Sequence, residues 1–315
     1  MPKNHLYIFN YDFNENDLCK LESKYIFNDL EQDKLLFSNV KIEPSISAFI
    51  KKRLDIISFS DDYNLLIKAI KNENIHCENF KVEYIVLSDD VTEYKERLQK
   101  LREIGHSIEG EAKYTNPTVV YGLCQHQNTW YFGTLIKNNF DWHKHKQKPH
   151  SFSNSISQSI GKSLVNIATK ANKKTSVLDV CCGVGTILLE GCFASHNITG
   201  SDINTKICKR TLENLAHFNY NATVINADIA NITEKYEAAI IDLPYNLFTK
   251  VSDDTNLHII KSTSKITNRL VIVSTTDISD LIIQIGFKLI EYCSVTKKGK
   301  INFSRKIWVC EKEIF

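Results

Sequence analysis

Residues 176–185 read S-V-L-D-V-C-C-G-V-G. A short apolar run leads into Asp179, and a Gly-x-Gly turn follows at Gly183 and Gly185. The next residues, T-I-L-L-E-G-C-F-A, carry apolar side chains at helical spacing. This order predicts a buried parallel strand, a tight glycine turn and a helix packed back onto the sheet. The turn would let a ligand lie against bare backbone at a helix N-terminus, where unpaired N–H groups and a partial positive charge are available.

Many α/β proteins contain a Gly-x-Gly turn, so the surrounding residues must decide which ligand it serves. A nicotinamide-dinucleotide site has a third glycine three residues after the second, and this chain has Leu188 there. Such a site also does not expect an acid inside the first strand, where Asp179 is found. The turn therefore indicates a ligand site, and the later strands must identify the ligand.

The length of 315 residues and the hydrophobic fraction of 43% predict two domains with sizeable cores. No apolar run approaches the roughly 20 residues that span a bilayer, and the N-terminus lacks the apolar core of a signal peptide. Nine cysteines without regular spacing indicate reduced thiols, so we expect a cytoplasmic protein with no membrane partner. The adjacent cysteines Cys181 and Cys182 make a poor metal pair, and no metal site is expected.

Charge differs between the two halves of the chain. Residues 1–136 hold 16 Lys and Arg against 21 Asp and Glu, and residues 137–315 hold 23 against 16. A basic aromatic linker is expected over residues 141–160, where flat rings alternate with lysines. This composition suits RNA phosphates and unstacked bases, and a solvated linker is an equally good interpretation of it. The candidate RNA-binding residues are Trp142, Lys144, Lys146 and Lys148.

The N-terminal region, residues 1–140, has the pattern of an α+β domain. Helices are expected over 45–57, 61–70 and 91–105, and strands over 80–87, 110–124 and 129–137. From residue 161 to 315 the pattern is that of an α/β domain with a doubly wound sheet. A fifth strand over 268–276 and an antiparallel hairpin of 287–295 with 304–312 complete this domain.

Four predicted strands of the C-terminal domain each end in an acid: Asp179, Asp202, Asp228 and Asp242. Because the carboxyl ends of parallel strands line one crevice, we expect the four carboxylates to lie together. One such acid alone could be a turn or cap residue, but four in register favour a binding site. If the ligand is S-adenosylmethionine, Asp179 would accept hydrogen bonds near its ammonium, Asp202 from its ribose and Asp228 from its adenine amine. The candidate cofactor-binding residues are Asp179, Cys181, Gly183, Gly185, Asp202, Ile203, Asp228 and Ile229, with Ile203 and Ile229 packing on the rings.

The fourth strand ends in D-L-P-Y, residues 242–245. The lone pair of an exocyclic amine is delocalised into its ring, so the amine is a poor nucleophile. The Asp242 carboxylate and the Leu243 carbonyl could accept both amine hydrogens and turn the lone pair toward a methyl donor. Pro244 would stiffen this backbone and Tyr245 would stack on an extruded base. The alternative is a strand-to-loop turn with a packed tyrosine.

From about Trp142 onward the chain resembles the THUMP-containing Rossmann-fold RNA methyltransferases, nearest the tRNA guanosine-10 N2-methyltransferase branch. The resemblance rests on K-P-H-S-F-S-N-S-I-S, V-L-D-V-C-C-G-V-G-T-I-L-L-E, G-S-D-I-N, N-A-D-I and D-L-P-Y-N, about half the chain. It implies a class I, seven-stranded methyltransferase domain with a C-terminal antiparallel hairpin. The stretch G-E-A-K-Y-T-N-P-T-V-V-Y-G-L is also similar to the final strands of a THUMP module, which implies an N-terminal RNA-binding region.

The implied activity is S-adenosylmethionine-dependent methylation of the exocyclic N2 amine of a guanosine in tRNA. The chain departs from the family pattern at Leu243, where a proline is usual, and at Val180, where a proline is frequent. Alternatives left open are an rRNA guanine-N2 or adenine-N6 methyltransferase, a DNA or protein-glutamine methyltransferase with the same signature, and a non-catalytic RNA-binding relative. The RNA, the nucleotide position and the oligomeric state do not follow from the sequence.

Overall fold

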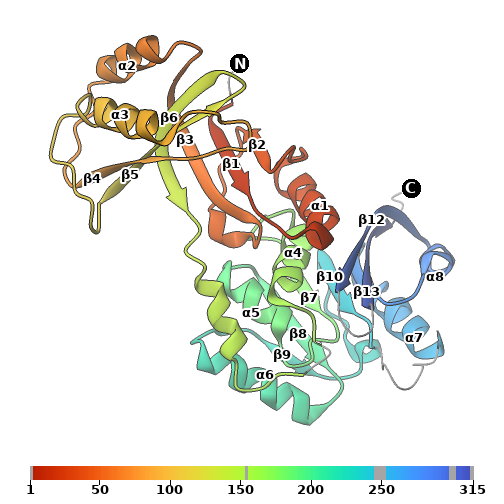
Figure 1. Ribbon diagram of the computed structural model, residues 1–315. Helices are drawn as coiled ribbons and strands as arrows, with labels where there is room; N and C mark the ends of the chain where they lie inside the picture. Colours follow the sequence, from red (N-terminus) through yellow and green to blue (C-terminus); the bar gives the residue numbers. More distant parts are fainter. Residues whose placement is uncertain (1–2, 153–154, 245–252, 298–302, 313–315) are drawn as a thin grey trace. The chain divides into compact units, whose positions relative to one another are not determined.

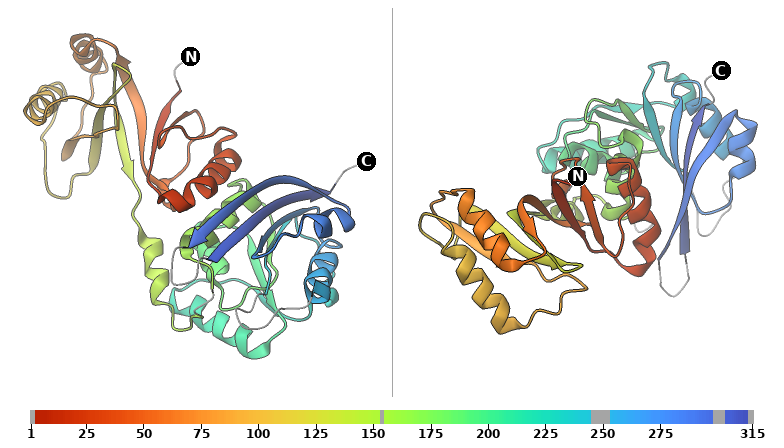
Figure 2. Two further views of the ribbon diagram at one scale, coloured as in Figure 1. Left: turned by 45° about the vertical axis from the view of Figure 1, so that its right-hand side comes forward. Right: turned by 90° about the horizontal axis from the view of Figure 1, so that it is seen from above.

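The computed structural model describes residues 3–152, 155–244, 253–297 and 303–312, and the chain divides into two compact units (Figures 1 and 2). The first unit comprises residues 1–10, 31–44 and 50–139, and the second comprises residues 11–30, 45–49 and 140–315. This division differs from the predicted boundary at residue 140, because helix α1 (Asn16–Phe27) belongs to the second unit. Among the described residues, no helix is both long and apolar enough to cross a bilayer.

The first unit is a six-stranded sheet with two helices on one face. The strand order is β2-β1-β3-β6-β5-β4, and only β4 and β5 pair in parallel within this described sheet. Apolar residues of both helices share a core cluster with β5 and β6. The elements are β1 (His5–Phe9), β2 (Leu35–Ser38), β3 (Ile50–Ser60), α2 (Tyr63–Asn72), β4 (Phe80–Tyr84), α3 (Tyr94–Gly105), β5 (Val119–His126) and β6 (Thr129–Lys137).

The segment 45–57, predicted to be helical, is mostly strand β3. Its apolar residues Ile50, Leu54 and Ile57 have helical spacing, but β3 pairs with β1 on one edge and β6 on the other. A register shift between Ile56 and Ser58 breaks the alternation that would have indicated a strand. Pairing on both edges therefore overrides the local pattern.

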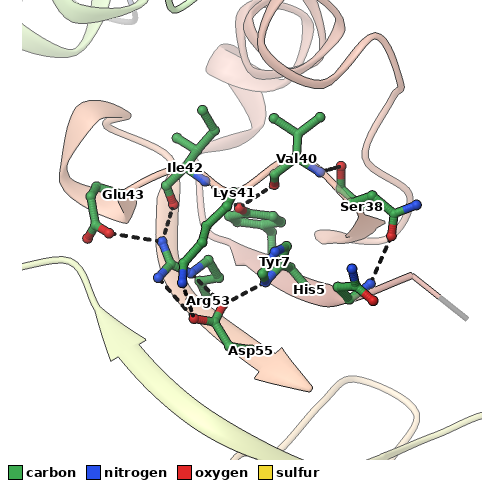
Figure 3. Close-up of polar contacts among 11 residues, drawn as sticks. His5, Tyr7, Ser38, Val40, Lys41, Ile42, Glu43, Arg53 and Asp55 are labelled. Atoms are coloured by element: carbon green, nitrogen blue, oxygen red, sulfur yellow. Dashed lines mark hydrogen bonds and ion pairs between the residues drawn. The ribbon is translucent and has the colours of Figure 1, made fainter. Parts of the chain in front are cut away.

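Arg53 on β3 is almost fully buried and joins a cluster of polar contacts in the first unit (Figure 3). Its guanidinium donates to the two carboxylate oxygens of Asp55 at 2.7 and 3.1 Å and to the carbonyl of Ile42 at 2.7 Å. His5 Nδ1 lies 2.7 Å from the same carboxylate. Burial alone would raise the pKa of Asp55, but the hydrogen bonds and charge of Arg53, with His5, hold it below its usual value.

The second unit is a seven-stranded sheet in the order β12-β13-β11-β10-β7-β8-β9. The five strands from β11 to β9 are parallel, and the β12–β13 hairpin adds to β11 in the antiparallel direction, as predicted (Figure 2). The strands are β7 (Val177–Asp179), β8 (Ile198–Asp202), β9 (Val224–Asn226), β10 (Ala238–Asp242), β11 (Arg269–Ser274), β12 (Phe287–Lys297) and β13 (Phe303–Lys312).

Helices cover both faces of this second sheet. Ala238 to Ile241 on β10 are all fully buried, which is the pattern of a central parallel strand. One face shares a core with α7 and α8, while α4 contacts β10 and β11. The helices are α1, α4 (Gln158–Thr169), α5 (Thr186–Phe193), α6 (Thr205–His217), α7 (Asp253–Thr263) and α8 (Ser279–Gln284). Short 3₁₀ turns are η1 (Phe13–Glu15), η2 (Pro44–Ile46), η3 (Asp141–Gln147) and η4 (Ile229–Asn231).

Candidate active site

The glycine turn follows β7 as predicted and leads directly into α5. Gly183 and Gly185 have φ angles of +53° and +82°, a backbone conformation that side chains other than glycine rarely adopt. A Cβ at Gly185 would lie 2.7 Å from Cγ2 of Thr211, so space as well as conformation requires glycine there. The Thr211 hydroxyl donates to the carbonyl of Gly183 and fixes the turn against α6.

Asp202, at the end of β8, is bound to this turn. Its Oδ2 accepts from the Gly183 N–H at 3.2 Å, and its Oδ1 accepts from the Asn204 N–H at 2.9 Å. Two backbone amides therefore orient the carboxylate beside the glycine turn. This is the position that a ribose-binding acid needs next to a nucleotide-binding turn.

Asn226, the last residue of β9, holds the loop that follows Asp202. Its side-chain amide donates to the carbonyls of Asp202 and Ile203, each at 3.0 Å, and accepts from the Thr205 hydroxyl at 2.7 Å. Asn226 is the first residue of the N-A-D-I motif, but no role was predicted for it from the sequence. Its position two residues before Asp228 could have indicated a role. An amide at the end of one strand can hydrogen-bond to the loop that follows the neighbouring strand.

Asp228 was predicted to end the third strand, but β9 ends two residues earlier and Asp228 is the N-cap of η4, where it faces a histidine of α7. Its Oδ1 accepts from the Ala230 N–H at 2.8 Å and lies 3.0 Å from Nε2 of His258. The backbone hydrogen bond and His258 together lower the pKa of Asp228, so this carboxylate is ionised at neutral pH. His258 was also not predicted as a site residue. It is on α7, after the fourth strand of the domain, and no local pattern relates it to Asp228.

A cavity of about 270 Å³ lies at this edge of the sheet and brings six predicted residues together. The apolar side chain of Ile203 is 69% exposed there, which leaves a flat surface against which a ring could pack. Burial raises the pKa of the Cys181 thiol, so this cysteine is a packing group of the cavity and not a nucleophile. The six predicted residues that line the cavity are Cys181, Asp202, Ile203, Asp228, Ile229 and Pro244, and His258 is also part of its wall.

Asp179 is fully buried at the end of β7. Among the residues that the structure describes, neither of its carboxylate oxygens has a hydrogen-bond partner. Burial, together with the charges of Asp242 and Asp202, raises the pKa of Asp179 well above its ordinary value. A buried carboxylate without a donor is costly, so this position is suited to a ligand that brings donors or positive charge.

Asp242 ends β10 and, like Asp179, has a buried carboxylate oxygen that no described residue satisfies. Its Oδ1 is buried and has no partner within the described part of the chain. Burial raises the pKa of Asp242 to about 7, and the positive charge of Arg305 opposes that rise. Leu243 is buried, with its N–H donating to the Val273 carbonyl at 3.0 Å. Tyr245, the last predicted residue of this signature, lies outside the described residues.

The predicted RNA-binding residues have different environments. Lys144 and Lys146 are exposed on η3, and Lys144 pairs with Asp141 at 2.5 Å. Lys148 is partly buried, and burial lowers its pKa. Trp142 is only 5% exposed and packs under the Lys162 ammonium, 5.6 Å from its ring. The prediction that Trp142 stacks on RNA is therefore wrong, because the residue is part of the core of the second unit.

Comparison with known families identifies this region. Residues 146–258 match the family described as "RMKL-like, methyltransferase domain". The second unit contains a methyltransferase domain. The matched residues include the glycine turn, Asp179, Asp202, Asp228 and Asp242, so the match and the geometry concern the same residues.

Two curated relatives share part of this methyltransferase domain. The chain is 30% identical over 117 residues to the tRNA (guanine(10)-N2)-dimethyltransferase of Methanothermobacter thermautotrophicus, which covers 36% of this chain and 34% of the relative. It is 24% identical over 181 residues to the enzyme of the same name from Methanocaldococcus jannaschii, covering 51% of each chain. The chain thus matches about half or less of the length of these relatives. Among solved structures, it is similar to TrmN from Thermus thermophilus, with 13% identity, coverage of 98% and 99%, and a TM-score of 0.48.

The residues of the methyltransferase domain fit S-adenosylmethionine, the methyl donor of this class of enzyme. The cofactor carries an ammonium and a sulfonium, and the Asp179 carboxylate, which has no partner in the described part of the chain, would accept from the ammonium. Asp202 and Asp228 would hold the ribose and the adenine amine, while Ile203 would lie against the adenine ring. When bound, the cofactor supplies an electrophilic methyl group.

Proposed function

We propose that this protein is an S-adenosylmethionine-dependent RNA methyltransferase that modifies the exocyclic N2 amine of a guanosine in tRNA. The observation that carries the proposal is Asp242, a carboxylate with a buried oxygen and a raised pKa at the strand end next to the cofactor acids. The names of the curated relatives support tRNA and guanine N2 as the target.

In this proposal, Asp242 and the Leu243 carbonyl accept the two hydrogens of the amine. That contact favours a more tetrahedral nitrogen with its lone pair directed at the methyl donor. A pKa of about 7 also suits Asp242 to take the proton that the amine loses on methylation. Tyr245 would stack on the target base.

RNA binding is proposed for two regions of the chain. The exposed Lys144 and Lys146 would contact phosphates, and the partly buried Lys148 would contribute less. The first unit would act as a THUMP-like RNA-binding module, an interpretation supported by the similarity of its last strands to that module.

The direct test is mass spectrometry of nucleosides. Purified full-length protein is incubated with an unmodified tRNA transcript and S-adenosylmethionine that carries a deuterated methyl group. We expect labelled N2-methylguanosine, and we expect the Asp242→Asn variant to form at least a hundredfold less at equal time. Label in N6-methyladenosine, or in no nucleoside of any tRNA, would contradict the proposal.

A further inference from the structure

The second unit contains another cavity, of about 380 Å³, that lies outside the cofactor cavity. Its wall comes from three segments: the η1 region, the loop that precedes α4, and the β12–β13 hairpin. None of its lining residues lines the cofactor cavity, and none was predicted from the sequence as a site residue.

Arg305 of β13 is the cation of this cavity. The residue is 7% exposed, and its Nη2 lies 3.4 Å from the carbonyl of Ser155 as a weak donor. The guanidinium also acts on Asp242, since its positive charge opposes the raised pKa of that carboxylate. The strand register gives the geometry: Asp242 lies opposite Val273, and Val273 lies opposite Ile307. Arg305, two residues from Ile307, therefore lies on the same face of the sheet as Asp242 and near the same edge.

The remaining wall carries carboxylates, hydroxyls and apolar side chains. Glu15 accepts from the Ser159 hydroxyl at 2.8 Å, and the Ser157 hydroxyl lies 3.0 Å from that of Ser159. Asp12 adds a second carboxylate, and Ile160 and Val295 add apolar surface.

This mixture of groups indicates which ligand would fit. Two carboxylates would repel a phosphate, so the cavity is poorly suited to an isolated anion. A neutral, flat base presents acceptors on one edge, donors on another and an apolar face. It can therefore pair with the guanidinium, the carboxylates and the apolar side chains of this cavity. Guanine presents its O6 and N7 acceptors together, and an arginine guanidinium matches that edge with two parallel hydrogen bonds.

We propose that this cavity receives the target guanine, with Arg305 donating to its O6 and N7 edge while its N2 amine reaches Asp242. The inference rests on the proposed function, because it places the target guanine of that reaction in this cavity. Arg305 is then a specificity-determining residue of the methyl-transfer site.

The test is single-turnover methyl transfer by the full chain at saturating S-adenosylmethionine, with RNA concentration varied. Arg305→Gln should lower the second-order rate for RNA by about 10- to 100-fold, and Arg305→Lys by less, because the ammonium offers only a single point charge. Lys306→Gln is the matched control, since neighbouring side chains on a strand point to opposite faces. Cofactor affinity, measured by calorimetry, should stay within about twofold in all three variants.

A second RNA separates recognition of the base from a structural role. A transcript made with 7-deazaguanosine lacks the N7 acceptor, so the wild type should lose rate on it and the gap between wild type and Arg305→Gln should shrink severalfold. The inference would be overturned if Arg305→Gln lost the same factor in rate on both transcripts, or if its rate recovered on raising the pH. Arg305 would then act only by lowering the pKa of Asp242. A Gln variant at the wild-type rate would overturn the inference alone, whereas absence of N2-methylguanosine with the wild type would overturn the proposed function as well.

Discussion

Two aspartates, one in each unit, show how a carboxylate behaves with and without hydrogen-bond partners. Asp55 in the first unit receives two hydrogen bonds from Arg53 and a contact from His5, and its pKa falls below its usual value. Asp242 in the second unit has a buried oxygen without a partner in the described chain, and its pKa rises to about 7. The first carboxylate is satisfied by the fold, and the second is left for a ligand. Partner supply, together with the deeper burial of the Asp242 carboxylate, thus separates a structural acid from a candidate catalytic one.

The sharpest way to break this comparison is Asp242→Asn. The substitution keeps the shape and one acceptor oxygen but removes the charge, so transition-state stabilisation should fall by about 3–4 kcal/mol, or about a hundredfold to a thousandfold in rate. Cofactor affinity should change only a few-fold. Single-turnover methyl transfer measures the effect, and the exposed Asp280→Asn serves as the control. A wild-type rate would remove Asp242 from the chemistry.

The proposed cofactor-binding acids Asp202 and Asp228 sharpen the comparison. Each accepts backbone hydrogen bonds and is also proposed to accept from the cofactor. Asp202→Ala should cost about 2–4 kcal/mol of S-adenosylmethionine affinity, through lost charge-assisted hydrogen bonds and release of the Gly183 amide. Asp202→Asn, which can still accept from that amide, should lose less. Calorimetry provides both values, and unchanged affinity in the Ala variant would exclude the ribose assignment.

On the structural side, Arg53→Leu should lower the free energy of unfolding of the first unit by about 2–3 kcal/mol, because Asp55 loses its main donor. Hydrogen exchange at the amides of β3 localises the loss to this unit. The exposed Arg102→Leu on α3 is the control and should change exchange little. If Arg53→Leu left β3 protection intact, the cluster of Figure 3 would not be a stabilising one.

The two aspartates should also respond to pH with opposite signs. Asp55 has a lowered pKa, so its stabilisation is present above the unfolded-state pKa near 4 and disappears as pH falls through its native value. Asp242 has a raised pKa, so its favourable contribution is present at low pH and is lost as pH rises through about 7. Asp242→Asn should therefore gain about 1–3 kcal/mol of stability relative to wild type between about pH 5 and pH 8.

Chemical unfolding of both variants at the two pH values checks this. Asp55→Asn should be less stable than wild type by the same amount at both, because Asp55 stays ionised throughout. A pH-independent difference for Asp242→Asn would mean that its carboxylate is not held in a costly environment.

Local sequence pattern was enough to predict the sheet of the second unit and six of the residues that line the cavity at its edge. Asp179, Asp202 and Asp242 each end a strand, and parallel strands necessarily bring their ends to one edge. The third predicted strand end was wrong by two residues, because β9 ends at Asn226 and Asp228 caps the turn that follows. The glycine turn was equally predictable, because its conformation excludes other residues.

The parts that were missed depend on contacts between distant residues. His258 reaches Asp228 from a helix 30 residues later, and Arg305, whose charge acts on Asp242, is on the last described strand. Residues 45–57 followed a helical spacing but became a strand through pairing with β1 and β6. Trp142 stands in a basic, polar stretch whose composition indicates a surface, yet its ring is buried. Neither tertiary pairing nor burial of a single ring is encoded in local periodicity.

Proton release on cofactor binding tests the central claim most directly, namely that Asp179 and Asp242, whose buried oxygens have no partner among the described residues, are left for ligands. The positive charge of S-adenosylmethionine should favour ionisation of Asp179 and Asp242, whose pKa values are raised, so binding below about pH 7 should release protons. The observed enthalpy should then differ between two buffers of different ionisation enthalpy, and Asp242→Asn should reduce that difference. Identical enthalpies in both buffers would contradict the account, because the carboxylates would already be ionised or would not meet the cofactor.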